Sequence, residues 1–302
     1  MQTTFVIQQV IVLAILMSVG YIATRRKIIT EEISNGMTLI LTNIGLPALI
    51  LSSFDMSYSK ETLKGVILIL LYSVIIHIFI ILISKVIFIK YSKEKKAVLA
   101  FGTIFANTGF MGLPLIFELF GQEAALYASV FMIPYHALQW TYGENMFSKE
   151  KSQGVIKKIA ASPALIAVIL GVVIFIFKIQ MPYVVGKPLS ILSSLTSPLS
   201  MLILGQKITK LKLKDLLLDK DVYYGCFVKL IIIPNLTLVL LKSLKAPELL
   251  LNISVIMQSL PTAILLVVLS QKHDGDIEFA SKFTLVSHIL SIITIPIISL
   301  LL

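Results

Sequence analysis

The sequence has little charge and only one cysteine. Of its 302 residues, 14% are charged and 57% are hydrophobic, whereas about a quarter of the residues in a soluble domain are charged. So few charges cannot cover the surface of a water-soluble protein of this length. The single cysteine, Cys226, excludes an internal disulfide framework, and its position inside an apolar run is typical of a small packing residue.

Motifs of common enzyme and metal sites are also missing. The chain has no His-Glu-x-x-His, Gly-x-Ser-x-Gly, Cys-x-x-Cys or Gly-x-x-x-x-Gly-Lys pattern. The segment His273-Asp274-Gly275-Asp276 resembles part of a calcium loop, but it lacks the other EF-hand ligands, so we expect a solvated turn. The apolar runs also lack the acidic pairs that a metal-dependent lipid-modifying enzyme needs. We therefore expect no enzyme activity and no resident metal or cofactor.

Apolar blocks make up most of the chain. A helix of about 20 apolar residues crosses about 30 Å of hydrocarbon, and the blocks leave no room for a sizeable soluble domain. The fold class that they predict is an all-α integral membrane protein with ten transmembrane helices. The predicted spans are residues 5–24, 33–53, 62–89, 97–120, 123–147, 162–177, 189–206, 223–241, 248–270 and 278–301.

Basic residues are unevenly distributed over the loops between these spans, and the net charge is +10. Loops that follow odd-numbered spans hold 17 Lys and Arg residues, and loops that follow even-numbered spans hold 6. Because basic residues concentrate on the cytoplasmic side, both termini are predicted outside the cell membrane. Arg25-Arg26-Lys27 follow the first span, which indicates a retained helix rather than a cleaved signal. We expect membrane lipids, and no nucleic acid, as partners of these charges.

Proline interruptions recur at a nearly constant offset. Pro47 and Pro198 are 151 residues apart in spans two and seven, and Pro114 and Pro261 are 147 apart in spans four and nine. Five spans per half force the second half to insert upside down, so the pattern predicts an inverted repeat. The predicted parts are a first repeat at 1–147, a short cytoplasmic linker at 148–161 and a second repeat at 162–302.

Spans four and nine are interrupted near their middles by polar residues, glycine and proline. Backbone without helical hydrogen bonds is tolerated at membrane depth only where it is buried in protein or lines a wet cavity. The half-helix that follows each break would present N–H groups and a positive dipole end to an anion. The carbonyls of the opposing half-helices would suit a cation. The alternative is that these are ordinary kinks, which are common in membrane helices. The residues concerned are Asn107, Thr108, Gly109 and Pro114 in span four and Gln258, Ser259, Pro261 and Thr262 in span nine.

Four further polar side chains within the predicted spans are candidates for substrate or proton binding. Lys229 in span eight either neutralises an anion or extends to the cytoplasmic face. His77 in span three either carries a proton or packs through a hydrogen bond. His136 and Gln139 share one face of span five and either line a substrate cavity or bond a neighbouring helix.

The stretch Ala106-Asn107-Thr108-Gly109-Phe110-Met111-Gly112-Leu113-Pro114-Leu115, together with Asn43-Ile44-Gly45-Leu46-Pro47, resembles the auxin efflux carrier family. That family includes plant PIN-type carriers and bacterial permeases for malonate or malate. The resemblance implies the fold of bile-acid symporters and sodium/proton antiporters, in which spans four and nine cross at their breaks. It also implies a substrate carboxylate beside Asn107, with Pro261 facing it. Residue 106 is alanine rather than the crossover proline of the plant carriers, and the loop 148–161 is short.

The resemblance further implies a scaffold of spans one, two, six and seven, through which a homodimer forms. Spans three to five and eight to ten would then form a moving bundle. We expect a secondary transporter of a small organic anion that works by an elevator-type motion. Because the chain lacks a phosphate-binding loop, a gradient must drive it, with H⁺ or Na⁺ as the possible coupling ion. The alternative is a ligand-gated channel or a receptor that senses a small anion.

Overall fold

The computed structural model describes residues 3–56, 59–148, 162–209 and 219–302. The predicted linker 148–161 lies outside these ranges except for Ser148. Within the described part of the chain every regular element is helical, apart from one isolated bridge between two residues. The all-helical prediction is therefore confirmed.

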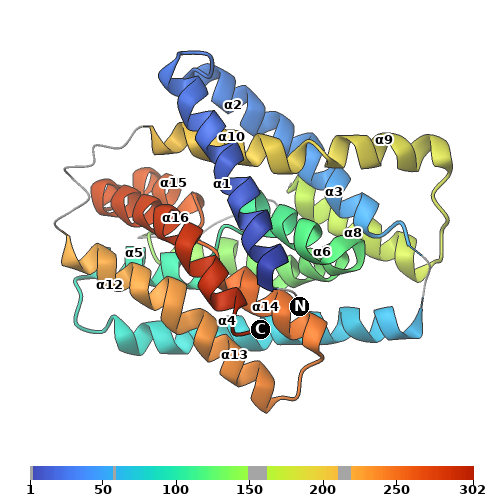
Figure 1. Cartoon of the computed structure of the whole chain (residues 1–302). Helices are drawn as coiled ribbons and strands as arrows, with labels where there is room; N and C mark the ends of the chain where they lie inside the picture. The colour runs from blue at the N-terminus through green and yellow to red at the C-terminus, as the bar shows by residue number, and fades with distance from the viewer. Residues whose placement is uncertain (1–2, 57–58, 149–161, 210–218) are drawn as a thin grey trace. The chain divides into compact units, whose positions relative to one another are not determined.

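The helices occupy the predicted apolar runs (Figure 1). The first half contains α1 (Thr3–Arg25), α2 (Glu31–Ile40), α3 (Leu46–Ser53), α4 (Lys60–Ile87), α5 (Lys93–Ile104) and α6 (Leu113–Leu138). The second half contains α8 (Pro163–Ile176), α9 (Tyr183–Ser193), α10 (Thr196–Ile208), α12 (Lys220–Phe227), α13 (Ile233–Ser243), α14 (Glu248–Ser259), α15 (Leu265–Lys272) and α16 (Ile277–Ser299). Four π-helical turns join or extend these helices, at Leu41–Gly45, Thr108–Gly112, Gln139–Gly143 and Val228–Ile232.

Six helical stretches in the described residues are long and apolar enough to cross a membrane. They are Glu31–Ser53, Lys60–Ile87, Thr108–Gly143, Tyr183–Ile208, Lys220–Ser243 and Ile277–Ser299. One of them starts earlier than predicted: helix begins at Tyr183 rather than at residue 189, and Pro188 lies inside α9. A proline inside a helix removes the hydrogen bond to the carbonyl four residues earlier, yet α9 continues through Pro188.

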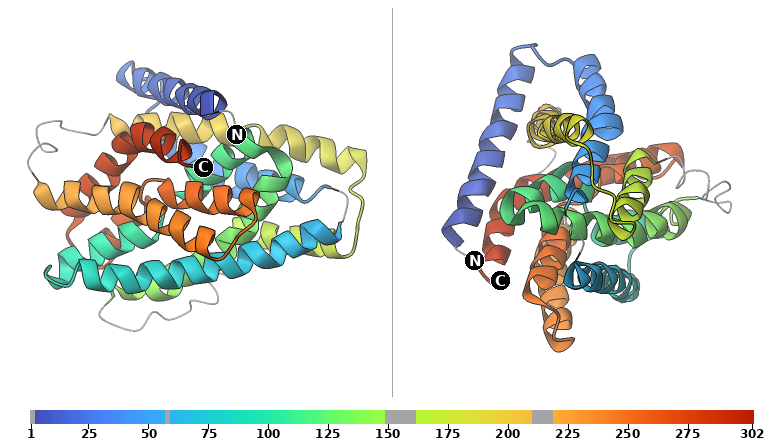
Figure 2. Two further views of the ribbon diagram at one scale, coloured as in Figure 1. Left: turned by 60° about the horizontal axis from the view of Figure 1, so that its bottom comes forward. Right: turned by 90° about the vertical axis from the view of Figure 1, so that its right-hand side faces the viewer.

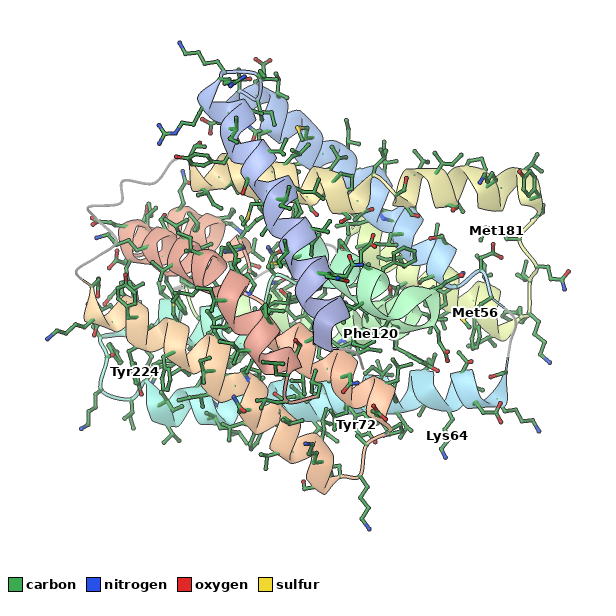
Figure 3. The ribbon with its side chains drawn as sticks, in the orientation of Figure 1. Met56, Lys64, Tyr72, Phe120, Met181 and Tyr224 are labelled. Atoms are coloured by element: carbon green, nitrogen blue, oxygen red, sulfur yellow. The ribbon has the colours of Figure 1, made fainter. Side chains whose placement is uncertain are left out.

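Away from their ends, these helices expose many large apolar side chains, as lipid contact requires. On α4, Leu71, Ile78, Leu82 and Val86 are 51%, 49%, 56% and 71% exposed. They recur at helical spacing along one face, whereas Tyr72 and its neighbours on the opposite face are buried (Figure 3). In water this stripe would be a large exposed apolar patch. We conclude that the chain is a multi-pass membrane protein.

The chain divides into two compact units. The first comprises Met1–Ile67, Gly109–Val130 and Ala160–Leu211. In this unit α1 crosses α10 at very close range (Figure 1). A Cβ atom added at Gly20 would lie 2.5 Å from the Leu202 carbonyl oxygen, and one added at Gly205 would lie 2.7 Å from the Tyr21 nitrogen. The two helices therefore touch backbone to backbone, which small residues allow.

Helix α6 is interrupted at Gly121, and the residue after this break bonds the end of α3. Gly121 has φ +80°, a conformation that favours glycine, and it interrupts α6 between the predicted ends of spans four and five. The next residue, Gln122, donates hydrogen bonds to the carbonyls of Ser52 (2.7 Å) and Asp55 (2.8 Å). These bonds tie the start of the second part of α6 to the end of α3 and to the turn that follows it.

The second unit comprises Leu68–Thr108, Phe131–Ile159 and Lys212–Leu302. Here α13 packs on α14, and α16 packs on α5, α12, α14 and α15 (Figure 2). The fully buried ring of Phe283 lies between Gly102 and Gly225, where added Cβ atoms would come within 3.0 Å and 3.1 Å of it. These glycines bring α5 and α12 close to α16.

Candidate functional site

The two predicted breaks in the second unit meet each other. Helix α5 ends at Ile104, and Phe105 is extended, with φ −105° and ψ 108°. Ala106 and Thr262 form an antiparallel bridge. The Asn107 N–H donates to the Pro261 carbonyl (2.8 Å), and the Ala263 N–H donates to the Phe105 carbonyl (2.9 Å). The interruptions are thus two short extended segments that pair across the break.

Proline explains where α14 stops. Leu260, the residue before Pro261, has φ −65° and ψ 154°, which is the extended conformation that a following proline favours. Pro261 also has no N–H to continue the helix. Helix α15 resumes only at Leu265. The opposing segment then supplies the hydrogen bonds that the broken helix cannot make.

The backbone donors nearest the break are already used. In addition to the two bridge bonds, the Thr108 N–H donates to the Ala106 carbonyl (2.8 Å), and the Thr262 N–H donates to the Ser287 hydroxyl (3.3 Å). The sequence predicts that the half-helix after each break presents N–H groups to an anion. Since these four are occupied, an anion bound there needs side-chain donors or the N–H groups of the following turns.

Asn107 carries the polar side chain that comes next after the bridge, and it is 3% exposed. Its Nδ2 lies 3.1 Å from Nε2 of His288, and Nδ1 of that histidine lies 2.7 Å from the Thr284 carbonyl oxygen. Sequence reasoning did not select His288. It lies among serine and threonine residues of a largely apolar helix, and no motif links it to a position 181 residues earlier.

Three buried side-chain oxygens near these segments have no hydrogen-bond partner within the described residues. They are Gln258 Oε1, Thr262 Oγ1 and Thr284 Oγ1. Gln258 is 1% exposed and Thr262 is fully buried. Buried polar atoms are nearly always paired, so these atoms are the strongest local indication of a bound ligand or water. The predicted residue Ser259 differs, because its hydroxyl donates to the Ile256 carbonyl (2.8 Å).

Lys229 brings a basic side chain to the end of α14. Its side chain is fully buried, and Nζ donates to the Gln258 carbonyl at 3.2 Å. That carbonyl belongs to the last turn of α14, where the helix dipole is negative. Extension of the side chain to the cytoplasmic face, the alternative that the sequence left open, does not occur.

Gln139 reaches the crossover through a tyrosine. Its Nε2 donates to the Tyr135 hydroxyl (2.8 Å), and that hydroxyl donates to the Ala106 carbonyl (2.6 Å). The His136 ring lies 5.0 Å from the Tyr135 ring, and neither of its nitrogens has a partner in the described structure. Gln139 therefore supports the bridge, and the His136 ring packs edge-on against Tyr135.

His77 packs against the same tyrosine. It is fully buried, its Nδ1 lies 2.7 Å from the Ser73 carbonyl oxygen, and its ring lies 5.8 Å from that of Tyr135. Gly109 and Pro114 lie in the first unit, in the turn Thr108–Gly112 and in the first turn of α6. Their predicted role in substrate binding stays a prediction.

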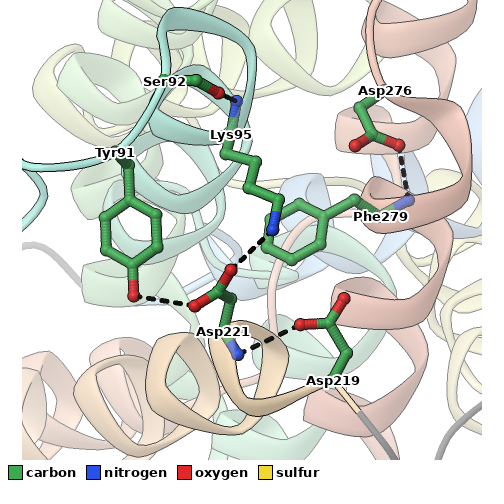
Figure 4. Close-up of polar contacts among 7 residues, drawn as sticks. All are labelled: Tyr91, Ser92, Lys95, Asp219, Asp221, Asp276 and Phe279. Carbon is green, nitrogen blue, oxygen red and sulfur yellow. Dashed lines mark hydrogen bonds and ion pairs between the residues drawn. The ribbon is translucent and has the colours of Figure 1, made fainter.

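A charged cluster lies at the start of α5 and α12 (Figure 4). Lys95 Nζ is 2.6 Å from Asp221 Oδ2, and the Tyr91 hydroxyl donates to Asp221 Oδ1 (3.2 Å). The hydrogen bond to Asp221 raises the pKa of Lys95. Burial and then the negative charge of Asp221 raise the pKa of Tyr91. In the described part of the chain no group of three His, Cys, Asp or Glu side chains could hold a metal ion.

Comparisons with known proteins agree with the sequence motifs. A model of the family described as membrane transport protein matches residues 5–157 and 151–299. An uncharacterized transporter of Methanocaldococcus jannaschii is 27% identical over 95% of each chain. One of Methanothermobacter thermautotrophicus is 25% identical over 100% of this chain and 99% of its own. The chain therefore belongs to the membrane transport protein family, which is the auxin efflux carrier family that its motifs resemble.

Proposed function

We propose that this membrane transporter is a secondary active transporter of a small organic anion, a carboxylate such as malonate, malate or an auxin-like acid. The observation that carries the proposal is the paired break in the second unit, where Asn107 and Thr262 lie on two segments joined by a backbone bridge. Paired interruptions at membrane depth are typical of transporter binding sites. No common enzyme motif competes with this interpretation.

The polar groups around the break support an anion as cargo. Lys229 provides a fully buried positive charge at the Gln258 carbonyl, and such charges inside membrane proteins mark substrate or ion pathways. The Asn107 amide provides a neutral donor. The unpaired oxygens of Gln258 and Thr262 would bond hydroxyl groups or water that accompany the anion.

The proposal includes an arrangement that the sequence predicts. Two inverted five-helix repeats, 1–147 and 162–302, would place both termini outside the cell membrane. Spans one, two, six and seven would form a scaffold and a homodimer interface, and the other six would carry the substrate by an elevator-type motion. This is supported by the loop charges and by the compact unit that contains both halves of the crossover.

Reconstitution tests the proposal directly. Proteoliposomes should accumulate labelled malonate, malate, pyruvate or indole-3-acetate, with and without Na⁺ and a pH gradient. Asn107→Ala and Pro261→Ala should each reduce uptake at least about tenfold, since each removes a group at the crossover. Gly36→Ala is the matched control, because an added Cβ there meets nothing within 4 Å. Wild-type rates in both crossover variants would refute the site.

Counterflow separates a transporter from the channel or receptor alternative. Vesicles loaded with unlabelled substrate should transiently accumulate labelled substrate, because a carrier exchanges one molecule for another. A channel gives no such overshoot, and a receptor gives no flux. Binding without counterflow would therefore replace transport by sensing as the function.

A further inference from the structure

His288 has a single possible tautomer when it is neutral. Its Nδ1 lies 2.7 Å from the Thr284 carbonyl oxygen, and a carbonyl only accepts hydrogen bonds, so Nδ1 carries the proton. The lone pair is then on Nε2, which accepts a hydrogen bond from the Asn107 amide nitrogen at 3.1 Å. The amide oxygen of Asn107 is consequently directed away from the imidazole ring.

A second proton on the ring reverses this arrangement. With a proton on Nε2 both ring nitrogens are donors, and Nε2–H would face the amide N–H of Asn107. A half-turn of the amide about its last bond turns its oxygen toward the ring and restores a hydrogen bond. The NH₂ group then points where the oxygen pointed before. The proton comes from water and stays on Nε2, and no covalent bond in the protein is broken.

We propose that His288 is the proton-binding site that couples proton and anion binding, with Asn107 as the group that transmits the change. A proton on Nε2 converts the outward face of Asn107 from an acceptor into a donor and adds a positive charge behind it. A carboxylate accepts hydrogen bonds and is negatively charged, so it binds better when the Asn107 NH₂ group faces outward and His288 is protonated. This inference rests on the proposed function, and it names the coupling ion as H⁺. Coupling between two binding events is reciprocal, so each should strengthen the other by about tenfold.

Other titratable groups around α16 have different partners. The elements packed against it are α5, α12, the turn Val228–Ile232, α14 and α15. Cys226 Sγ lies 4.0 Å from the Phe283 carbonyl oxygen, and Lys229 bonds the Gln258 carbonyl. The remaining charges on these elements lie in end turns, at 93–96, 220–221, 248 and 272. In the second half of α6, the Tyr135 hydroxyl bonds the Ala106 carbonyl and the His136 ring lies against Tyr135.

Binding of pyruvate at two pH values tests the coupling. Pyruvate stays fully ionised throughout, so any change comes from the protein. The wild-type protein should bind it at least about tenfold more tightly at about pH 5.5 than at about pH 8, because the proposed proton on Nε2 is bound at the lower pH and absent at the higher. His288→Gln should abolish the difference, and His273→Gln, a histidine outside the proposed site, should keep it. Equal affinities in the wild type, or an unchanged difference in His288→Gln, would overturn the proposal.

A ligand-free measurement separates this proposal from the proposed function. The chain has four histidines, so ¹⁵N-histidine NMR can identify His288 as the signal lost in His288→Gln. We expect a proton on Nδ1 alone at high pH and on both nitrogens at low pH. A proton on Nε2 alone, or a ring that never takes a second proton, overturns the coupling whatever the ligand. If no carboxylate binds at either pH, the proposed function fails, and this spectrum still decides the protonation of His288.

Discussion

Gly102→Ala tests the close packing at the crossover. An added Cβ would lie 2.8 Å from Thr262 Oγ1 and 3.0 Å from Phe283 Cδ1, whereas carbon atoms pack at about 3.5–4.0 Å. Both neighbours are fully buried, so neither can move into solvent. Overpacking of this kind costs about 1–3 kcal/mol. Alanine also gains about 0.5–1 kcal/mol over glycine inside a helix.

Gly36→Ala isolates the clash from the helix preference. Gly36 lies inside α2, and an added Cβ there meets nothing within 4 Å. This variant should therefore be slightly stabilised. The two variants should differ in their free energy of unfolding by the cost of the clash alone. This is about 1–3 kcal/mol, which corresponds to roughly 2–10 °C in melting temperature.

Thermal unfolding in detergent, with counterflow as a second measurement, shows whether the clash at residue 102 is present. Gly102→Ala should melt below Gly36→Ala and transport more slowly, because Thr262 is displaced. Adding Phe283→Leu to Gly102→Ala should recover part of the lost stability, a coupling that distant sites do not show. Equal melting temperatures for the two alanine variants would mean that α5 does not approach α16 as closely as described.

Three further predictions concern other parts of the molecule. Gly205→Ala should destabilise the protein by at least about 2 kcal/mol in thermal unfolding, because its Cβ meets the backbone of α1 rather than a side chain; stability equal to wild type would contradict that contact. Lys229→Met should change unfolding by less than about 1 kcal/mol, since a buried charge is replaced by an apolar group of similar volume. It should also weaken carboxylate binding about tenfold, and unchanged affinity would remove Lys229 from the site. Asp221→Asn should flatten the loss of stability at alkaline pH. The pKa values of Lys95 and Tyr91 are higher in the folded than in the unfolded protein, which stabilises the fold below about pH 10. This stabilisation is lost as the pH rises through the pKa values of the folded state. An equally steep loss in the variant would show that Asp221 is not the cause.

Much of the helical framework could be predicted because lipid contact is a local property. Runs of apolar residues marked the helices, and the Gly/Pro interruptions marked the breaks at Asn107 and Pro261. Gly121 interrupts its helix between two predicted spans because a single glycine suffices for that turn. Residues 183–188, which precede the predicted span 189–206, are also helical, since α9 begins at Tyr183.

The partners of the site residues could not be predicted, because they are set by packing between distant helices. Nothing near His288 in the sequence indicates that it bonds Asn107. Tyr135 was only a neighbour of the predicted residues His136 and Gln139, yet its hydroxyl bonds the crossover carbonyl. The use of the Thr262 N–H by Ser287 is another such case. Each contact depends on the relative rotation of two helices, which hydropathy does not encode.

The backbone hydrogen bonds between the two broken spans have a consequence for a carrier without bound substrate. A carrier that gives net movement of one substrate must also reorient without cargo. If the N–H groups of Asn107 and Ala263 depended on substrate for their hydrogen bonds, departure of the substrate would leave them bare at membrane depth, at a cost of several kcal/mol each. Because they bond the carbonyls of Pro261 and Phe105 instead, the unloaded crossover is already complete. In a carrier that works as proposed above, this pairing would leave no backbone cost to reorientation of the empty state.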